Sequence, residues 1–304
     1  MRPSLVWIPG GTFTMGSDRF YPEEGPAHDE TVDGFFIDRT PVTNAQFARF
    51  VEETGHVTVA EVAPRAEDYP GAPLDRLVPG GAVFVPRSGP VDLRDASQWW
   101  VYVPGADWRH PTGPDSTIDD KEDHPVVQVA FDDAAAYAAW AGAALPSETQ
   151  WERAARGGLD GAAFAWGDER APDGHVPANV WVGAFPWRSD EPWGTRPVAS
   201  YAPNGYGLYD MTGQVWEWTT DYWSPRHTGR EHACCSPPTD PLAPSIPLRV
   251  LKGGSYLCAD EYCMRYRPAA RIAEAVDTAT CHLGFRTIRP SRPRSPENNQ
   301  AAVA

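Results

Sequence analysis

Only three stretches of this 304-residue chain have helical periodicity, and all three are short. The first begins with a capping box, Thr43 to Gln46, and its apolar residues recur at helical spacing until Gly55. The second covers residues 132–141, and the third begins with a capping box at Ser147 and ends at the glycines 157–158. We expect all three helices to pack in the core without chemistry of their own, and the rest of the chain to form short strands and turns.

Turn-forming residues are frequent outside these helices, because the chain contains 32 prolines and 27 glycines. Residues 5–15 are typical of a hairpin around Gly10-Gly11, whereas residues 57–125 have no sustained periodicity. The aromatic residues of this long segment indicate that it is ordered, and a long ordered loop is often functional. We find no linker and no internal repeat. The sequence therefore predicts one α+β domain with little regular secondary structure over residues 1–289, followed by a disordered tail over residues 290–304.

The acidic balance of the chain restricts its partners. A formal net charge of −15 argues against binding to nucleic acid or to anionic membranes, and it would attract a basic peptide. The apolar run of residues 5–8 is too short for a signal peptide, and residues 134–145 are too few to span a membrane. We therefore predict a cytoplasmic protein. Disulfides are not expected there among its five cysteines, and the neighbours Cys234 and Cys235 would form a strained one.

The segment of residues 252–271 carries the most chemical information. It places Cys258 and Cys263 five positions apart, behind a Gly-Gly pair that allows close approach of the backbone. If the chain is extended after Cys263, Arg265 and Arg267 lie on the same face as this thiol. Nearby cations, with Lys252 among them, would lower the pKa of a thiol and favour the thiolate.

A pair of thiolates is suited to copper(I), which is soft and accepts few ligands, whereas structural zinc takes four. Cys281-His282 would complete a zinc site, so zinc is an alternative. A second alternative is that both cysteines are buried and structural, since cysteine is often found in cores.

This segment resembles the active-site sequence of formylglycine-generating enzymes. It has the Gly-Gly-Ser start, the Cys258-x-x-x-Tyr-Cys263 pair and the Arg-Tyr-Arg-x-Ala-Ala-Arg ending of that family. The similarity extends along nearly the whole chain, through residues 8–16, 41–47, 124–129, 137–142, 145–152, 203–218 and 283–286. All relatives of the fold share these other stretches, whereas the two cysteines in their setting are specific to the oxidase.

The resemblance implies a variant of the C-type lectin fold and a copper(I)-dependent oxidase. Such an enzyme uses dioxygen to convert the cysteine of a Cys-x-Pro-x-Arg segment, in an unfolded sulfatase, to Cα-formylglycine. By position, Cys258 and Cys263 match the catalytic copper ligands. Three further residues match positions that line the pocket beside them: Ser255, Trp216 and His282.

The same resemblance implies bound calcium, a hard cation that prefers carboxylate and carbonyl oxygens. One calcium site matches four positions in a turn that contains a glycine: the side chains of Asp210 and Glu217, and the carbonyl groups of Gly213 and Val215. A second site matches Asn179, the Val180 carbonyl group and Asp190.

Two other classes of function fit a chain of this kind. The first is a non-catalytic, lectin-like binding module, but a pure binding module has no need of the two cysteines. The second is a sulfoxide synthase of the ergothioneine type, which resembles this fold over its C-terminal part. Such an enzyme needs an iron site of histidines and an extra helical domain, and this chain has no His-x-x-x-His motif.

Overall fold

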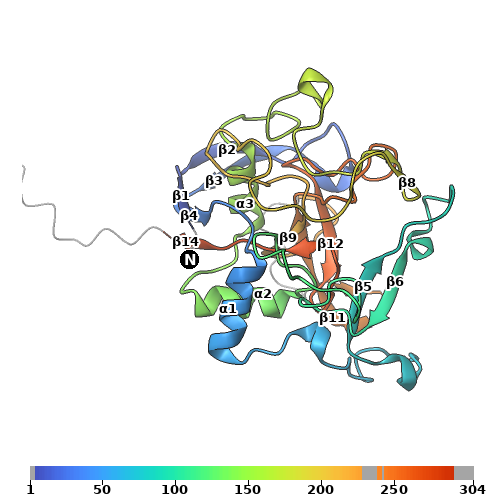
Figure 1. Ribbon diagram of the computed structural model, residues 1–304. Coiled ribbons are helices and arrows are strands. Elements are labelled where there is room, and N and C mark those ends of the chain that lie inside the picture. The colour runs from blue at the N-terminus through green and yellow to red at the C-terminus, as the bar shows by residue number, and fades with distance from the viewer. Residues whose placement is uncertain (1–3, 228–237, 242, 291–304) are drawn as a thin grey trace, which may run out of the picture.

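The computed structural model describes residues 4–227, 238–241 and 243–290, which form one α+β domain (Figure 1). This part of the chain has three α-helices: α1 (Asn44–Thr54), α2 (Phe131–Trp140) and α3 (Glu148–Arg156). All three confirm the predicted helices. Both predicted capping boxes form, and a left-handed glycine ends α1 and α3 in the same way. Single-turn 3-10 helices cover Pro22–Glu24, Val59–Glu61, Leu74–Arg76, Ala96–Gln98 and Pro172–Gly174.

The strands form small sheets. A three-stranded sheet has the order β1 (Leu5–Ile8), β4 (Phe35–Asp38), β14 (Ile288–Pro290). A five-stranded sheet joins β9 (Trp216–Tyr222), β10 (Thr239–Asp240), β11 (Ala243–Lys252), β12 (Arg271–Ala275) and β13 (Leu283–Gly284). Three two-stranded ribbons pair β2 (Gly11–Met15) with β3 (His28–Val32), β5 (Gly80–Phe84) with β6 (Trp100–Pro104), and β7 (Gly183–Ala184) with β8 (Arg188–Ser189).

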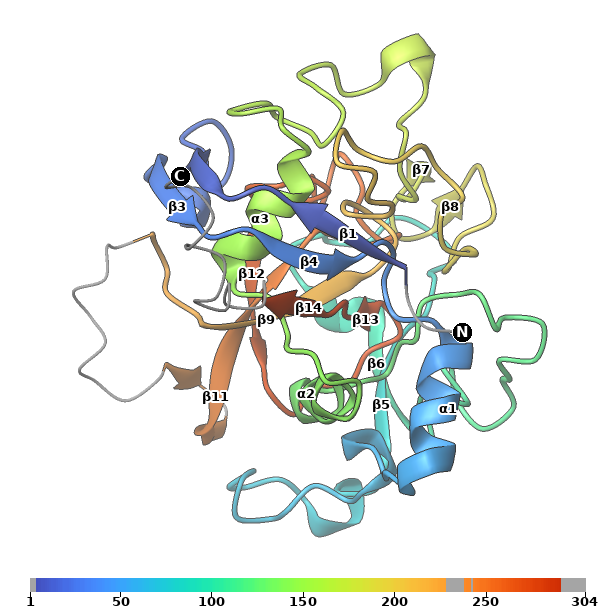
Figure 2. The same ribbon diagram turned by 90° about the vertical axis from the view of Figure 1, so that its left-hand side faces the viewer.

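The predicted hairpin over residues 5–15 is wrong. β1 pairs with β4 and β2 pairs with β3, so both strands lie along the segment of residues 28–38. Gly10 is needed for close packing instead of a turn, because a Cβ atom added there would lie 2.7 Å from the amide nitrogen of Gly34. Figure 2 shows β1, β4 and β14 side by side, with α3 behind them. Apolar side chains of β1 and β4 pack there against Trp151 of α3.

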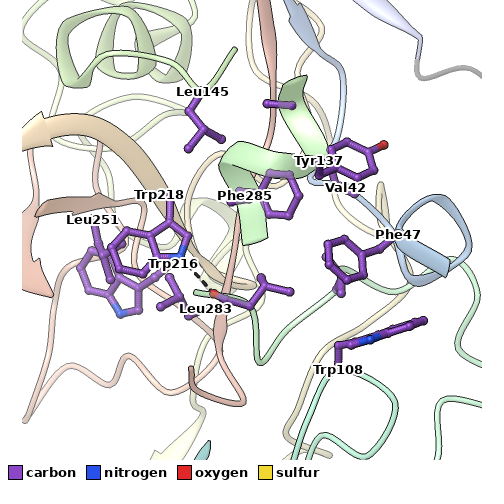
Figure 3. Packing of buried hydrophobic residues seen from close by; sticks show 14 of the residues in the cluster. Val42, Phe47, Trp108, Tyr137, Leu145, Trp216, Trp218, Leu251, Leu283 and Phe285 are labelled. Atoms are coloured by element: carbon purple, nitrogen blue, oxygen red, sulfur yellow. Dashed lines mark hydrogen bonds between the residues drawn. The ribbon is translucent and has the colours of Figure 1, made fainter. Parts of the chain in front are cut away.

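The largest core cluster joins the helices to the five-stranded sheet. In Figure 3 the rings of Phe47, Tyr137 and Phe285 face one another, and Trp216 and Trp218 lie beside Leu251. The indole nitrogen of Trp218 donates to the carbonyl oxygen of Val129 at 3.0 Å. Cys258 belongs to this same cluster, so the core supports one side of the thiol segment.

The long segment of residues 57–125 is ordered, as its aromatic residues predict. It contains the β5–β6 hairpin, and its residues Phe84, Trp99 and Trp108 are buried. At the other end of the chain, β14 includes residue 290, and residues 291–304 of the predicted tail lie outside the described residues. Among the helices that the structure describes, none is long and apolar enough to cross a membrane.

Candidate metal centre

Cys258 and Cys263 lie side by side, with their Sγ atoms 3.1 Å apart. A backbone hydrogen bond of 2.7 Å, from the amide of Cys263 to the carbonyl oxygen of Ala259, closes the loop between them. Gly254 has a left-handed φ of 71°, and a Cβ atom there would lie 2.8 Å from the carbonyl oxygen of Arg265. The predicted role of the Gly-Gly pair is thus confirmed, since only glycine fits this close approach.

The two thiols differ in their surroundings. A hydrogen bond with Cys258 and the guanidinium group of Arg265 lower the pKa of Cys263. Burial and the neighbouring sulfur raise the pKa of Cys258, whose Sγ accepts a hydrogen bond of 3.4 Å from the amide of Ser255. The opposite directions of the two pKa shifts favour the proton on Cys258 and the thiolate on Cys263. Loss of the last proton would leave two adjacent soft anions, which is the donor set that copper(I) prefers.

Arg265 is the cation that faces the thiols. Its Nη1 atom lies 4.0 Å from Sγ of Cys263, and its Nη2 atom donates to Glu23 at 2.7 Å. The same guanidinium group stacks 3.8 Å from the ring centre of Tyr21, whose hydroxyl group accepts a hydrogen bond from the amide of Met264. Glu23 and Tyr21 therefore hold Arg265 in place, and no spacing in the sequence links them to the cysteines.

The prediction that Lys252 and Arg267 also face the thiols is wrong. Lys252 is fully buried and its Nζ atom lies 2.9 Å from Glu152, whereas Arg267 forms a two-pronged ion pair with Glu24. Residues 263–267 form no strand, and of the two arginines only Arg265 reaches the sulfur of Cys263.

A second set of contacts fixes the loop between the cysteines. Asp260 accepts a hydrogen bond of 2.5 Å from the hydroxyl group of Tyr266 and one of 2.9 Å from Nε of Arg170. Tyr266 is buried and stacks on Phe164, with ring centres 5.9 Å apart. Arg170 and Asp260 thus join the thiol loop to a segment about 90 positions away. Sequence reasoning missed this pair, because a salt bridge between distant loops has no periodic signal.

Of the residues predicted to line the pocket, Ser255 and Trp216 are buried and His282 is partly buried. The amide of Ser255 donates a hydrogen bond to Sγ of Cys258, and the hydroxyl group of Ser255 accepts one from the amide of Leu257. Trp216 packs in the same core cluster as Cys258. The ring of His282 lies against Trp100, with ring centres 4.8 Å apart, and its Nδ1 atom is 2.6 Å from the hydroxyl group of Thr280. Burial lowers the pKa of His282 to about 3, so this ring is neutral.

In the first predicted calcium site, several of the ligand oxygens already accept hydrogen bonds from other residues of the protein. Both carboxylate oxygens of Glu217 accept hydrogen bonds from Arg286, and one also accepts from the indole nitrogen of Trp151. Oδ2 of Asp210 accepts from the amide of Ala199. Burial raises the pKa of Asp210, and the nearby charge of Glu217 raises it further. The turn contains the expected glycine, Gly213, and ends at the buried Val215; Asp210, Gly213 and Gln214 all have a left-handed φ.

The residues of the second calcium set have separate partners. The side-chain amide of Asn179 donates to the carbonyl oxygen of Gly194 and to Gln214, while Val180 packs against the core. The carboxylate of Asp190 is 57% exposed and lies 3.4 Å from Nε of Arg188. The structure therefore does not supply Asp190 with a contact to the other two residues.

The zinc alternative is not supported by the described residues, in which no three histidine, cysteine, aspartate or glutamate side chains come together as a metal site. The Cys281 sulfur instead accepts hydrogen bonds from the amide of Phe84 and from the hydroxyl group of Tyr256. Cys234 and Cys235 lie outside the described residues.

Comparison with known proteins extends the similarity to the whole domain. Residues 1–291 match the family model described as the sulfatase-modifying factor enzyme 1-like domain. The formylglycine-generating enzyme of Mycobacterium tuberculosis is 56% identical over 95% of this chain and 98% of its own length. The enzyme of the same name from Thermomonospora curvata is 46% identical over 93% of this chain and 92% of its own length.

Two further proteins are similar to this chain in sequence or in fold. A mouse protein named inactive Cα-formylglycine-generating enzyme 2 is 37% identical over 93% of this chain and 85% of its own length. The structure of PvdO from Pseudomonas aeruginosa shares the fold, with a TM-score of 0.62 and 23% identity over 95% of both chains. The family match and the similarity to both bacterial enzymes, over nearly the full length of each chain, show that this chain belongs to the formylglycine-generating enzyme family.

Proposed function

We propose that this protein oxidises a cysteine of a partner sulfatase to formylglycine, with dioxygen as oxidant and copper(I) held by Cys258 and Cys263. The observation that carries the proposal is the 3.1 Å contact between the two thiols, one of them beside a guanidinium group. It occurs in a chain 56% identical to a protein named for this activity. A scaffold that served only for binding would not need to bring two thiols together in this way.

The residues around the thiols have separate tasks in this proposal. Arg265 stabilises the Cys263 thiolate, and Glu23 holds Arg265. The link from Arg170 to Asp260 keeps the loop closed, so that both sulfurs point to one place. Copper(I), when bound, would supply a soft, electron-rich centre for the activation of dioxygen. Because Cys263 is only half-buried, a cysteine in an extended, unfolded segment can reach it, whereas one packed in a folded core cannot.

The test is conversion of a Cys-x-Pro-x-Arg peptide, followed by mass spectrometry and by trapping of the aldehyde with a hydrazide. Two of the electrons that dioxygen accepts come from the substrate cysteine, so the reaction includes a thiol reductant to supply the rest. We expect aldehyde only when copper, dioxygen and reductant are all present. The matched control is the same peptide with serine in place of the reacting cysteine. Absence of the aldehyde under complete conditions would refute the proposal.

We also propose that calcium binds at Asp210, a partly buried carboxylate that accepts one hydrogen bond, from the amide of Ala199 to Oδ2. Saturating calcium then stabilises the fold by about 2–3 kcal/mol, and a chelator should lower Tm by about 3–5 °C. Asp210→Ala should have a lower Tm than the unmodified protein, both with calcium and with chelator.

Thermal unfolding with and without chelator checks this expectation. Glu217→Ala is unsuitable as the variant, because it would leave the fully buried Arg286 without its carboxylate whether or not calcium binds. Asp168→Ala removes an exposed carboxylate and is the control. A Tm of the unmodified protein that does not respond to chelator would contradict the calcium proposal.

A further inference from the structure

A large cleft lies away from the thiols, between the segment of residues 56–78, the β5–β6 hairpin and the turn of residues 277–279. Its volume is about 1160 Å³. Sites for single small molecules are typically about 300–1,000 Å³, so the volume of this cleft is large enough for several residues of a polypeptide.

The walls of the cleft carry apolar side chains that face solvent. Val57 is 58% exposed, Val62 55%, Leu74 76% and Tyr102 46%. Isolated exposed apolar residues are common on protein surfaces, but several on one concave wall indicate a binding surface. The hydrophobic part of a partner would be removed from water here.

The cleft is also acidic. Five aspartates and two arginines line it, which leaves a formal charge of −3. Asp277 accepts a short hydrogen bond from Tyr69, and its pKa is raised by burial and by the charges of Asp68 and Asp240. A cationic group from a partner would relieve this repulsion, so the charge of the cleft complements a basic side chain.

The β5–β6 hairpin connects the cleft to the thiol loop. Gly80 and Pro104 line the cleft at one end of the hairpin, Ala82 and Tyr102 line it at the middle, and at the other end Trp100 packs on His282. Phe84 belongs to the same cluster as Leu257 and Ala259 of the thiol segment. A strand of five residues is about 17 Å long at about 3.3 Å per residue, a distance that a short extended peptide can span.

We propose that the cleft binds a second stretch of the polypeptide that carries the reacting cysteine, one with apolar side chains and a basic residue. This inference rests on the proposed function, because only an enzyme that acts on an extended protein chain gains from two contacts on one substrate. The second contact raises the local concentration of the reacting segment at the thiols.

The test compares two peptides. The short one contains only the Cys-x-Pro-x-Arg segment, and the long one adds about fifteen flanking residues with apolar side chains and one lysine, on either side in turn. The double variant Val62→Ser, Leu74→Ser removes two exposed side chains that line the cleft. We expect its KM for the long peptide to rise about tenfold, with its kcat/KM for the short peptide unchanged. Leu159→Ser is the matched control, since Leu159 is 41% exposed and does not line the cleft.

A charge exchange tests the acidic part of the cleft. Asp68→Lys should weaken the binding of the long peptide, and changing the peptide lysine to glutamate should restore that binding. Asp68 is also paired with Arg65 at 2.7 Å, so the Tm of Asp68→Lys is measured beside its KM. An unchanged KM for the long peptide in the double variant, or an equal loss for both peptides, would overturn the inference. So would a dimer that the double variant dissociates, as measured by sedimentation, because a second copy of the chain would then occupy the cleft.

Failure of the proposed function can be told apart from failure of this inference. A labelled long peptide with serine in place of its cysteine reports binding by fluorescence anisotropy and needs no turnover. If that peptide binds to the unmodified protein and binds more weakly to the double variant, the cleft is a polypeptide site even when no aldehyde forms. If it does not bind while the short peptide is converted, the inference is wrong and the proposed function stands.

Discussion

Cys258→Ser and Cys263→Ser should each lose bound copper and lower turnover by a thousandfold or more, on the order seen when a group essential to the chemistry is removed. Serine places a hard, protonated oxygen where a soft anion is needed. The fold should survive, because Ser255 can donate its amide hydrogen to a serine hydroxyl group as it does to the sulfur of Cys258. Bound copper, aldehyde formation and circular dichroism of each variant check this expectation together.

Cys281→Ser is the matched control for these variants. Cys281 is also a free, buried cysteine, but its sulfur is held by Phe84 and Tyr256 and not by the other thiols. This variant should keep its copper and most of its activity. If Cys258→Ser and Cys263→Ser stay folded and still form aldehyde, the two thiols are structural and the proposed mechanism is wrong.

Glu152→Gln should destabilise the protein by about 3–5 kcal/mol, the usual loss when one partner of a buried ion pair is removed. Glu152 is fully buried and accepts hydrogen bonds from Lys252 at 2.9 Å, from Arg156 at 2.6 Å and from the amide of Gly16 at 2.8 Å. Removal of its charge leaves two buried cations without this partner. Urea denaturation of the variant and the unmodified protein gives the difference in the free energy of unfolding.

The stability that Glu152 provides should depend on pH in a defined range. Burial opposes its charged form, but Lys252 and Arg156 outweigh burial and lower its pKa to about 2, from 4.5. A carboxylate with a lowered pKa in the folded state stabilises the fold fully above the unfolded value, and this contribution is lost as pH falls from about 4.5 to about 2. The difference in the free energy of unfolding between the unmodified protein and Glu152→Gln should therefore be constant at neutral pH and become smaller between pH 4.5 and pH 2. A difference that persists unchanged at pH 2 would contradict the assignment.

The sequence by itself determined the features that depend on neighbouring residues. The capping boxes at Thr43 and Ser147 and the glycines that follow α1 and α3 act within one or two turns, so the pattern of residues was sufficient to predict these helices. The similarity of the segment around Cys258 and Cys263 to a known family also depended on a continuous stretch of chain.

Only the tertiary structure decided which distant groups meet. Gly10-Gly11 was expected to form the turn of a hairpin, and instead Gly10 allows the segment after β1 to approach the segment before β4 closely. Helix α3 packs in the core as expected, but its residues Glu148 and Glu152 also bind the buried cations Lys252 and Arg271, which lie 100 or more positions away.

Tertiary structure also decided which charged groups lie beside the thiols. Lys252 and Arg267 are near the cysteines in the sequence, but each forms an ion pair with a buried carboxylate elsewhere in the fold. Arg265 remains beside Cys263 because Glu23, from the other end of the chain, holds it there. A charged side chain that is taken out of water must have a partner of opposite charge. Three-dimensional packing determines which partner is within reach, and periodicity and spacing contain no information about it.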